Sequence, residues 1–468
     1  MTNTFKLILG ILITSFVFTN CASDEKKKRT IPVNSIAEIT TVLSPTVEKF
    51  EVKVNEETIL KGKKGTSIYI PANTFQFEDG TTPTAAVTIE IKECYSLTDM
   101  IFEDLQTTSK DQILETNGMI YLNAESNGKK LSVKEGKAVV IGFPKKNADK
   151  EMDLFYEVQL NDSTKTWIPN YELFEFTAER AANTTDGEGD SFYNIEYPIE
   201  MTDDLYYYGY SPYTWTSRFD RIQFKGTNKT IIDYIETLKD IDSTDAYLFY
   251  KNNWYINLDF NIDKNGKMHN FKPRFYSDEK YNEQAIKITT ELFKSLPLID
   301  LDESNSDWRF SLGISSKRML NKEKFKQKFR EKYANYTNTA IEKIDPNALE
   351  YYMFSATEMG WINCDRFWDV DANEKTDFIV KTTNPKETKI RIIFKDIKSI
   401  MTGTYENGVL VFKNIPKEKE IKVIGISYAN GKPTLSVETA TTDTENFELT
   451  NFKEFSLDEL ETELNSLQ

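Results

Sequence analysis

Histidine and cysteine are scarce in this sequence, whose 468 residues include one histidine and three cysteines. The single imidazole, His269, excludes most zinc enzymes and leaves little room for histidine-based catalysis. Positive charge is also in short supply, since 58 Lys and Arg face 74 Asp and Glu and give a net charge of −16. Nucleic-acid binding needs a basic face, so this balance argues against nucleic acid as a partner. With no P-loop, glycine-rich dinucleotide turn or Cys-x-x-Cys pair, the sequence predicts no cofactor and no metal centre.

Large aromatic rings are what the chain has in quantity, because 30 Phe, 24 Tyr and 6 Trp make up 13% of it. Charged residues account for a further 28%. Such a chain can bury substantial cores and is not disordered as a whole. At ~100–200 residues per domain, its length predicts about two to four domains.

The one long apolar run lies at the N-terminus. Lys6 precedes an apolar stretch from Leu7 to Phe18. As a helix this stretch is about 18 Å long, which is too short for the ~30 Å hydrocarbon core of a membrane. That length is typical of a signal peptide, which we predict over residues 1–20. Cys21 follows directly.

A cysteine that closes such a stretch resembles the processing site of bacterial lipoproteins, where it carries diacylglycerol and becomes the first residue of the mature chain. The acidic pair after Cys21 and the Asn-, Lys-, Phe- and Tyr-rich composition are similar to those of Bacteroidota lipoproteins. The resemblance implies lipidation of Cys21, a tether over residues 21–45, and anchoring to the outer membrane on either face. The alternative is an ordinary secretory signal followed by a chance cysteine.

Short alternating runs separated by turn residues follow the tether. Ile68 and Ile70 alternate with their neighbours, and Asn127–Gly128 is a hairpin-turn signal. Strands at this spacing are typical of a β-sandwich, which we predict over 46–215 with an irregular extension. Within 46–144, the segments GTSIYIPANTF and VTIEIKE resemble the core of the sandwich shared by zonula-occludens proteins, ankyrins and netrin receptors. Some members of that family cleave themselves at a His-Phe-Ser site, which this sequence lacks, so that activity is not implied.

The middle of the chain combines two amphipathic segments with a hairpin. Helices are predicted at 228–241 and 279–297, on either side of an alternating strand at 255–262. The segment DFNIDKNGKMHNFK, the helix ending LFKSLP and the strand 308–315 resemble the C-terminal domain of TonB. The resemblance implies an α+β module over 216–318 that binds a partner peptide by strand addition. The predicted peptide-binding edge consists of Ile256, Leu258, Phe260 and Ile262.

The last third of the chain is predicted to contain a charged helix and a second β domain. Residues 319–350 read as a helical spacer. Short strands with turns at Asn407–Gly408 and Asn430–Gly431 resemble an immunoglobulin-like or carboxypeptidase-regulatory-like domain over 351–445. A C-terminal helix is predicted within 446–468. The fold class expected is therefore multidomain and mainly β with an α+β middle.

Cys94 and Cys364 are the two cysteines left after lipidation of Cys21. An oxidising periplasm permits a disulfide between them. A bridge would require the two predicted β domains to bring the Cα atoms within about 7 Å. The alternative is a pair of buried thiols, because single cysteines beside apolar residues behave as small hydrophobes.

Other candidates for chemistry have simpler interpretations. Asn261, Asp263 and Asn265 match part of a calcium loop, but Lys272 stands where the bidentate glutamate belongs, so a turn is favoured. With 74 carboxylates, the sequence cannot nominate an acid pair for glycosidase chemistry. The function expected is a non-catalytic, lipid-anchored envelope protein that binds a protein or peptide through sheet edges. The alternative is an envelope hydrolase that acts on glycan or peptidoglycan through acidic residues.

Overall fold

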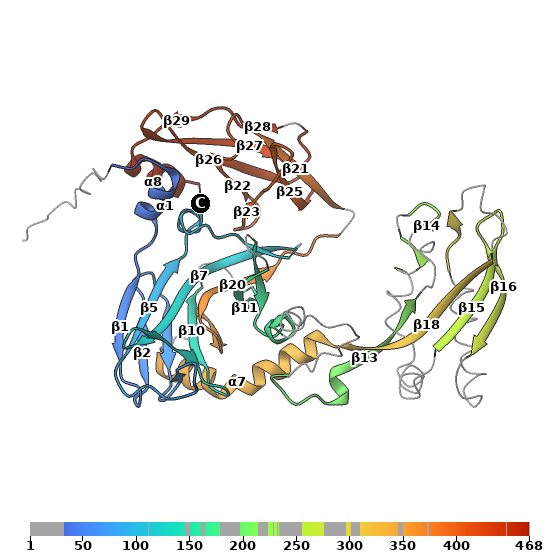
Figure 1. Ribbon diagram of the computed structural model, residues 1–468, viewed down its shortest axis with the longest axis horizontal. Coiled ribbons are helices and arrows are strands. Elements are labelled where there is room, and N and C mark those ends of the chain that lie inside the picture. Colours follow the sequence, from blue (N-terminus) through green and yellow to red (C-terminus); the bar gives the residue numbers. More distant parts are fainter. Residues whose placement is uncertain are drawn as a thin grey trace, which may run out of the picture. The chain divides into compact units, whose positions relative to one another are not determined.

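A computed structural model gives the fold of most of the chain (Figure 1). The residues that the structure describes are 32–110, 112–145, 150–160, 164–177, 197–213, 223–227, 229–231, 233, 255–275, 296–300, 309–344, 350–371, 374–445 and 447–467. They are mainly β, as the sequence predicts, and form several sheets. The predicted signal peptide and Cys21 lie outside the described residues. Among the described residues, no helix has the length and apolar character needed to span a membrane.

The chain divides into two compact units that are discontinuous in sequence. Unit 1 comprises residues 1–48, 92–120 and 365–468, and unit 2 comprises residues 49–91 and 121–364. These units do not follow the predicted boundaries at 215 and 351. Residues 92–120, expected in the first β domain, belong to unit 1, and residues 351–364, expected in the second, belong to unit 2. Strand pairing between residues far apart in the chain decides this membership, and local patterns do not report it.

The largest sheet has the strand order β1-β5-β7-β20-β11-β12, and β6 and β8 also pair with β7. These strands are β1 (Glu48–Val52), β5 (Val87–Cys94), β6 (Thr108–Ser109), β7 (Gln112–Ser126), β8 (Lys129–Lys130), β11 (Asp153–Gln159), β12 (Lys165–Pro169) and β20 (Gly360–Phe367). The predicted Asn127–Gly128 turn joins β7 to β8, and both residues have positive φ angles, 51° and 73°. Such angles favour asparagine and glycine, so this turn is specified locally.

Unit 2 contains a second sheet, covered by the long helix α7 (Lys322–Ile344). Its order is β19-β10-β3-β2, with β2 (Thr58–Lys61), β3 (Ser67–Ile70), β10 (Val139–Pro144) and β19 (Tyr351–Ala356). Ala340 and Ile344 of α7 are buried against Tyr69 and Val140 of this sheet. The helix expected at 319–350 is confirmed, but its role as a spacer is wrong, because its apolar face is part of a core.

A third sheet of unit 2 has the order β13-β18-β15-β16. Its strands are β13 (Tyr206–Tyr213), β15 (Tyr255–Ile262), β16 (Met268–Phe275) and β18 (Arg309–Leu320). The hairpin and the closing strand of the predicted α+β module are thus confirmed as strands, while most of its two predicted helices lies outside the described residues. The hairpin turn needs glycine at Gly266, where φ is +84° and an added Cβ would stand 1.9 Å from the Ile299 carbonyl oxygen.

Unit 1 contains two sheets that share a core. Their orders are β24-β25-β21-β28 and β23-β22-β26-β27-β29. The strands are β21 (Lys375–Lys381), β22 (Lys389–Phe394), β23 (Ile400–Thr402), β24 (Thr404–Glu406), β25 (Val409–Pro416), β26 (Glu420–Ala429), β27 (Lys432–Thr441), β28 (Phe447–Glu448) and β29 (Lys453–Glu454). Phe378 and Phe412 from the first sheet meet Ile392 and Val423 from the second in this core. The apolar residues of the alternating pattern predicted for these strands therefore face the shared core.

Helices complete unit 1 at both ends of its chain. α1 (Ile36–Leu43) buries Ile39 and Leu43, and the Val33 carbonyl accepts a hydrogen bond from Tyr428 at 2.8 Å. The predicted tether over 21–45 is therefore too long, because residues from Val33 onward pack on unit 1. The predicted C-terminal helix is confirmed as α8 (Leu457–Asn465), capped by Ser456. The short helix α2 (Leu97–Phe102) contacts both.

The remaining short elements are the strand pairs β4 (Phe75–Gln76) with β9 (Ser132–Val133) and β14 (Gln223–Phe224) with β17 (Ile299–Asp300), and the 3-10 turn η1 (Asp203–Leu205). All of them belong to unit 2.

Candidate functional site

A groove of about 810 Å³ lies within unit 2, between α7, β19 and the segment 150–154 that leads into β11. We call it the α7 groove. Along the helix it is lined by Lys326, Arg330, Tyr333 and Thr337, among others, and along the strand by all residues from Tyr351 to Ser355. This volume is in the range of sites that bind small ligands or peptide side chains.

The sequence of α7 explains why this helix forms one wall of the groove. Phe325, Phe329 and Tyr333 recur every fourth residue and are buried together with Leu205. That spacing puts the three rings on one face of a helix. Asn321, just before the first turn, accepts a hydrogen bond from the Lys324 backbone N–H at 3.1 Å and so caps the helix.

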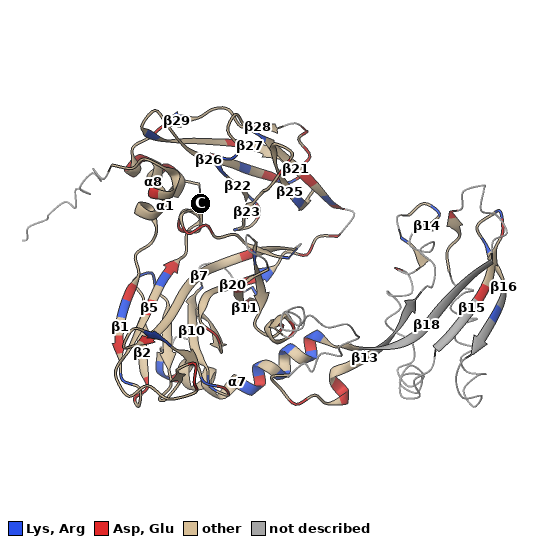
Figure 2. Cartoon of the chain, viewed as in Figure 1, with Lys and Arg blue, Asp and Glu red and all other residues tan. Residues whose placement is uncertain are grey.

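Ion pairs fix the charged flank of α7 to the same unit. Asp153, which is 8% exposed, accepts from Lys326 at 2.7 Å and from Arg330 at 2.5 Å. Glu151 adds a contact to Arg330 at 3.3 Å. Further pairs along the helix are Lys322–Glu172, Lys328–Asp204 and Lys343–Glu57. The blue bands along α7 in Figure 2 therefore include cations that engage this protein's own carboxylates, while Lys324 and Lys332 donate to the backbone carbonyls of Asp204 and Pro198.

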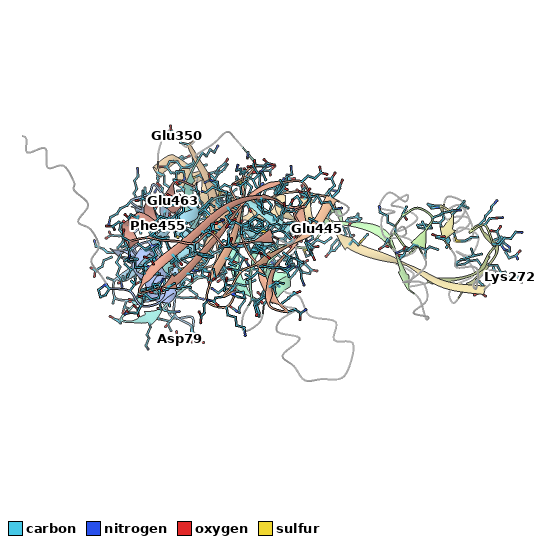
Figure 3. The ribbon with its side chains drawn as sticks, turned by 90° about the horizontal axis from the view of Figure 1, so that it is seen from above. Asp79, Lys272, Glu350, Glu445, Phe455 and Glu463 are labelled. Carbon is cyan, nitrogen blue, oxygen red and sulfur yellow. The ribbon has the colours of Figure 1, made fainter. Side chains whose placement is uncertain are left out.

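The opposite wall is an edge strand. Among the described strands, β19 pairs with β10 alone, in an unbroken antiparallel register that sets Tyr352 opposite Phe143 and Phe354 opposite Ile141. The Lys145 N–H donates to the carbonyl of Glu350, which is labelled in Figure 3, at 2.7 Å. Hydrogen-bonded pairs recur at every second residue of such a ladder. Tyr352, Phe354 and Ala356 therefore bond to β10.

The alternate residues of β19 point their backbone groups away from the sheet. By the same register, these are Tyr351, Met353 and Ser355. Met353 packs against the cluster that contains Ala340 and Ile344 of α7, and the Ser355 hydroxyl lies 2.8 Å from the Thr337 hydroxyl, so both side chains reach the helix. The open edge of β19 and one face of α7 thus line the same groove.

The end of β19 is held by the buried hydroxyl of Tyr156. The Tyr156 hydroxyl accepts the backbone N–H groups of Thr357 and Glu358 at 2.9 and 3.2 Å. Burial raises the pKa of Tyr156 to about 12. Burial also raises the pKa of Tyr171, over whose ring Lys326 lies at 5.5 Å, and the pKa of Tyr333. All three phenols are therefore neutral at physiological pH.

The predicted peptide-binding edge at Ile256, Leu258, Phe260 and Ile262 is wrong. These residues lie on β15, which pairs with β16 on one side and with β18 on the other. Both backbone edges of β15 are therefore occupied, and the terminal strands of this sheet are β13 and β16. Lys272, labelled in Figure 3, lies exposed on β16.

The remaining sequence candidates do not join the groove. Cys94 and Cys364 are both buried and are not joined in a disulfide, so the thiol alternative is the one present. His269 lies on β16 opposite Asn261. Asp263 accepts the N–H groups of Asn265 and Lys267 at 2.8 and 3.0 Å, which agrees with the turn interpretation of this segment.

No set of three or more His, Cys, Asp or Glu side chains within the described ranges is arranged to hold a metal ion. Comparisons of the chain with protein-family models, curated proteins and solved structures find no match.

Little in the sequence indicates the groove. The segment YYMFSA of β19 lacks the apolar alternation by which the other strands were predicted, and every residue from Tyr351 to Ser355 is half-buried. The charged helix was visible, but the burial of its carboxylate partner Asp153 was not. The one signal in the sequence is a basic helix within a chain of net charge −16, which indicates that the helix pairs with acidic residues of the same protein.

Proposed function

We propose that this protein binds an extended segment of a protein partner, which pairs as an added strand with the open edge of β19 and packs its side chains against α7. The observation that carries the proposal is the edge strand itself, because Tyr351, Met353 and Ser355 line the α7 groove and their backbone groups point away from β10. A polypeptide in extended conformation is the ligand that complements such a row of donors and acceptors. At ~3.3 Å per residue, six residues of β19 offer roughly 20 Å of edge.

The charges of the groove favour binding over hydrolysis. Asp153 is held by Lys326 and Arg330, and Glu151 contacts the same two cations. A general acid or base must present its carboxyl to the substrate, whereas these carboxylates are used to fix the helix. We therefore propose a non-catalytic role in place of the alternative of glycan or peptidoglycan hydrolysis.

The cellular setting is proposed from the N-terminal sequence. Lipidation of Cys21 would anchor the protein to the outer membrane, with residues up to about 32 as the connection to α1. The two sheets of unit 1 are proposed to form the immunoglobulin-like sandwich expected of the C-terminal domain. The module at 216–318 is proposed to keep a TonB-like architecture, with strand addition assigned to β19 in place of β15.

Peptide binding can be tested by panning a random dodecapeptide display library against the mature chain. We expect the selected peptides to protect the amides of Tyr351, Met353 and Ser355 from hydrogen exchange. Met353→Pro removes one outward N–H and should weaken binding by at least about tenfold, or about 1.4 kcal/mol. Met353→Ala keeps that N–H and separates the effect of the lost side chain.

A matched control lies on the other edge of the same sheet. Gly62 N–H donates to the Thr66 carbonyl, so every second residue of β2 from Gly62 bonds to β3. Ile59 lies between these residues, and its backbone N–H therefore points away from the sheet. Ile59→Pro should leave peptide affinity unchanged. Selected peptides that bind Met353→Pro as tightly as the wild type, or that leave the β19 amides unprotected, would contradict the proposal.

Membrane anchoring requires a separate experiment. Replacing Cys21 with serine should move the protein from the membrane fraction to the soluble fraction, because two or three acyl chains give firm anchoring and their loss removes it. Metabolic labelling with a fatty acid provides the direct measurement. A wild-type protein that takes up no label would rule out lipidation, without any consequence for the α7 groove.

A further inference from the structure

Two cations of unit 1 share a single carboxylate. Lys389 and Arg391 alternate on β22 and therefore project from the same face of the sheet. Both contact the same oxygen, Oδ1 of Asp104, with Lys389 Nζ at 3.0 Å. Asp104 stands two residues after α2, and its side chain is 69% exposed, whereas that of Arg391 is 6% exposed. The cluster is thus two enclosed cations beneath one solvent-facing anion.

The negative charge at this cluster does not balance the positive charge. The neighbouring Glu103 already pairs with Lys92 at 2.7 Å. Burial and the nearby Arg391 guanidinium lower the pKa of Lys389, and the carboxylates of Asp104 and Glu103 offset this only in part. Within the guanidinium, one amino group donates to the Ile390 carbonyl at 2.9 Å and the other contacts Asp104, while the buried Nε–H has no hydrogen-bond partner. A buried donor without a partner is costly.

We propose that Lys389 and Arg391 form a binding site for a small oxyanion, a carboxylate or a phosphate, which exchanges with the Asp104 side chain. An anion with two or more oxygens can bond the guanidinium at two N–H groups and the ammonium at the same time. Asp104 engages the guanidinium through Oδ1, the same oxygen that Lys389 contacts. Because its side chain is mostly in solvent, rotation into water opens the site without moving the strands.

Calorimetric titration of the full mature chain with sodium phosphate and with sodium acetate tests this site. Asp104→Asn removes the internal competitor, and we expect it to bind an oxyanion at least about tenfold more tightly than the wild type. Adding Lys389→Met to that variant should abolish the binding. The anion that binds more tightly, phosphate or acetate, identifies which oxyanion the site prefers.

Glu420→Gln is the matched control, because it releases Lys395 from an ion pair in the same unit. This pair contains one cation only, so the release of Lys395 should create no oxyanion-binding site. Saturable binding that appears in Asp104→Asn and disappears with Lys389→Met supports the proposal. Asp104→Asn that binds neither anion, or that binds no better than Glu420→Gln, overturns it.

If Asp104→Asn fails to fold, oxyanion binding can be tested on the wild type by thermal unfolding. Phosphate should raise the midpoint above the value in chloride of equal ionic strength, and the rise should be absent from Lys389→Met. Equal midpoints in the two salts would mean that the cations serve the fold alone.

Discussion

Replacing Asp153 with alanine is expected to destabilise unit 2 by about 3 kcal/mol and to abolish peptide binding. The substitution leaves Lys326, whose side chain is 11% exposed, without its carboxylate partner. Removing one member of a buried ion pair typically costs about 3–5 kcal/mol, because the other charge stays desolvated. Urea unfolding measures the loss, and hydrogen exchange should report the earliest opening at α7.

Glu151→Gln provides the control for this experiment. Glu151 contacts the same two cations, at 3.8 Å from Lys326 and 3.3 Å from Arg330, but its side chain is 76% exposed. An exposed pair of this kind is worth about 0–1 kcal/mol, so stability and peptide affinity should change little. Equal losses in Asp153→Ala and Glu151→Gln would show that burial of Asp153 does not control the docking of α7.

Replacing Phe378 with alanine is expected to cost unit 1 about 3–5 kcal/mol, because it opens a cavity in a closely packed core. Phe378 is 1% exposed, and its ring lies 6.4 Å from that of Phe412 and 5.5 Å from that of Phe447. These two contacts join β25 and β28 to β21, so the substitution should lower the stability of the whole sheet. Chemical denaturation followed by circular dichroism gives the magnitude.

The next residue of the same strand supplies the control. Ile379 points to the other face of the sheet and is 40% exposed. Ile379→Ala should change the free energy of unfolding by less than about 1 kcal/mol, since most of that side chain is already in water. A similar cost for both variants would mean that the shared core of the two sheets does not hold unit 1 together.

The ion pairs of the two units differ in how many carboxylates accompany the cations. In unit 2, the cations of α7 meet the carboxylates Glu57, Asp153, Glu172 and Asp204, and the pairs fix the wall of the groove. In unit 1, Lys389 and Arg391 share one carboxylate oxygen. The first arrangement is a closed set of pairs that serves the fold. The second retains an excess of positive charge, and for this reason it is assigned to a ligand.

The sequence by itself determined those features that depend on a few adjacent residues. The turns at Asn407–Gly408 and Asn430–Gly431 were predicted correctly, because both positions of each turn have positive φ angles that asparagine and glycine adopt most readily. The helices α7 and α8 follow from apolar spacing and from the capping residues Asn321 and Ser456. The mainly β character follows likewise from alternation within single strands.

Only the tertiary structure decided which strands lie at an edge and which carboxylates are buried. β15 alternates as an edge strand could, yet β16 and β18 occupy both its sides, while β19 shows no alternation and is open. A strand's neighbours come from distant parts of the chain, and the local pattern records burial of its faces rather than pairing of its edges. Asp153 and Lys326 are 173 residues apart. Their contact, and with it the α7 groove, exists only once the helix has docked.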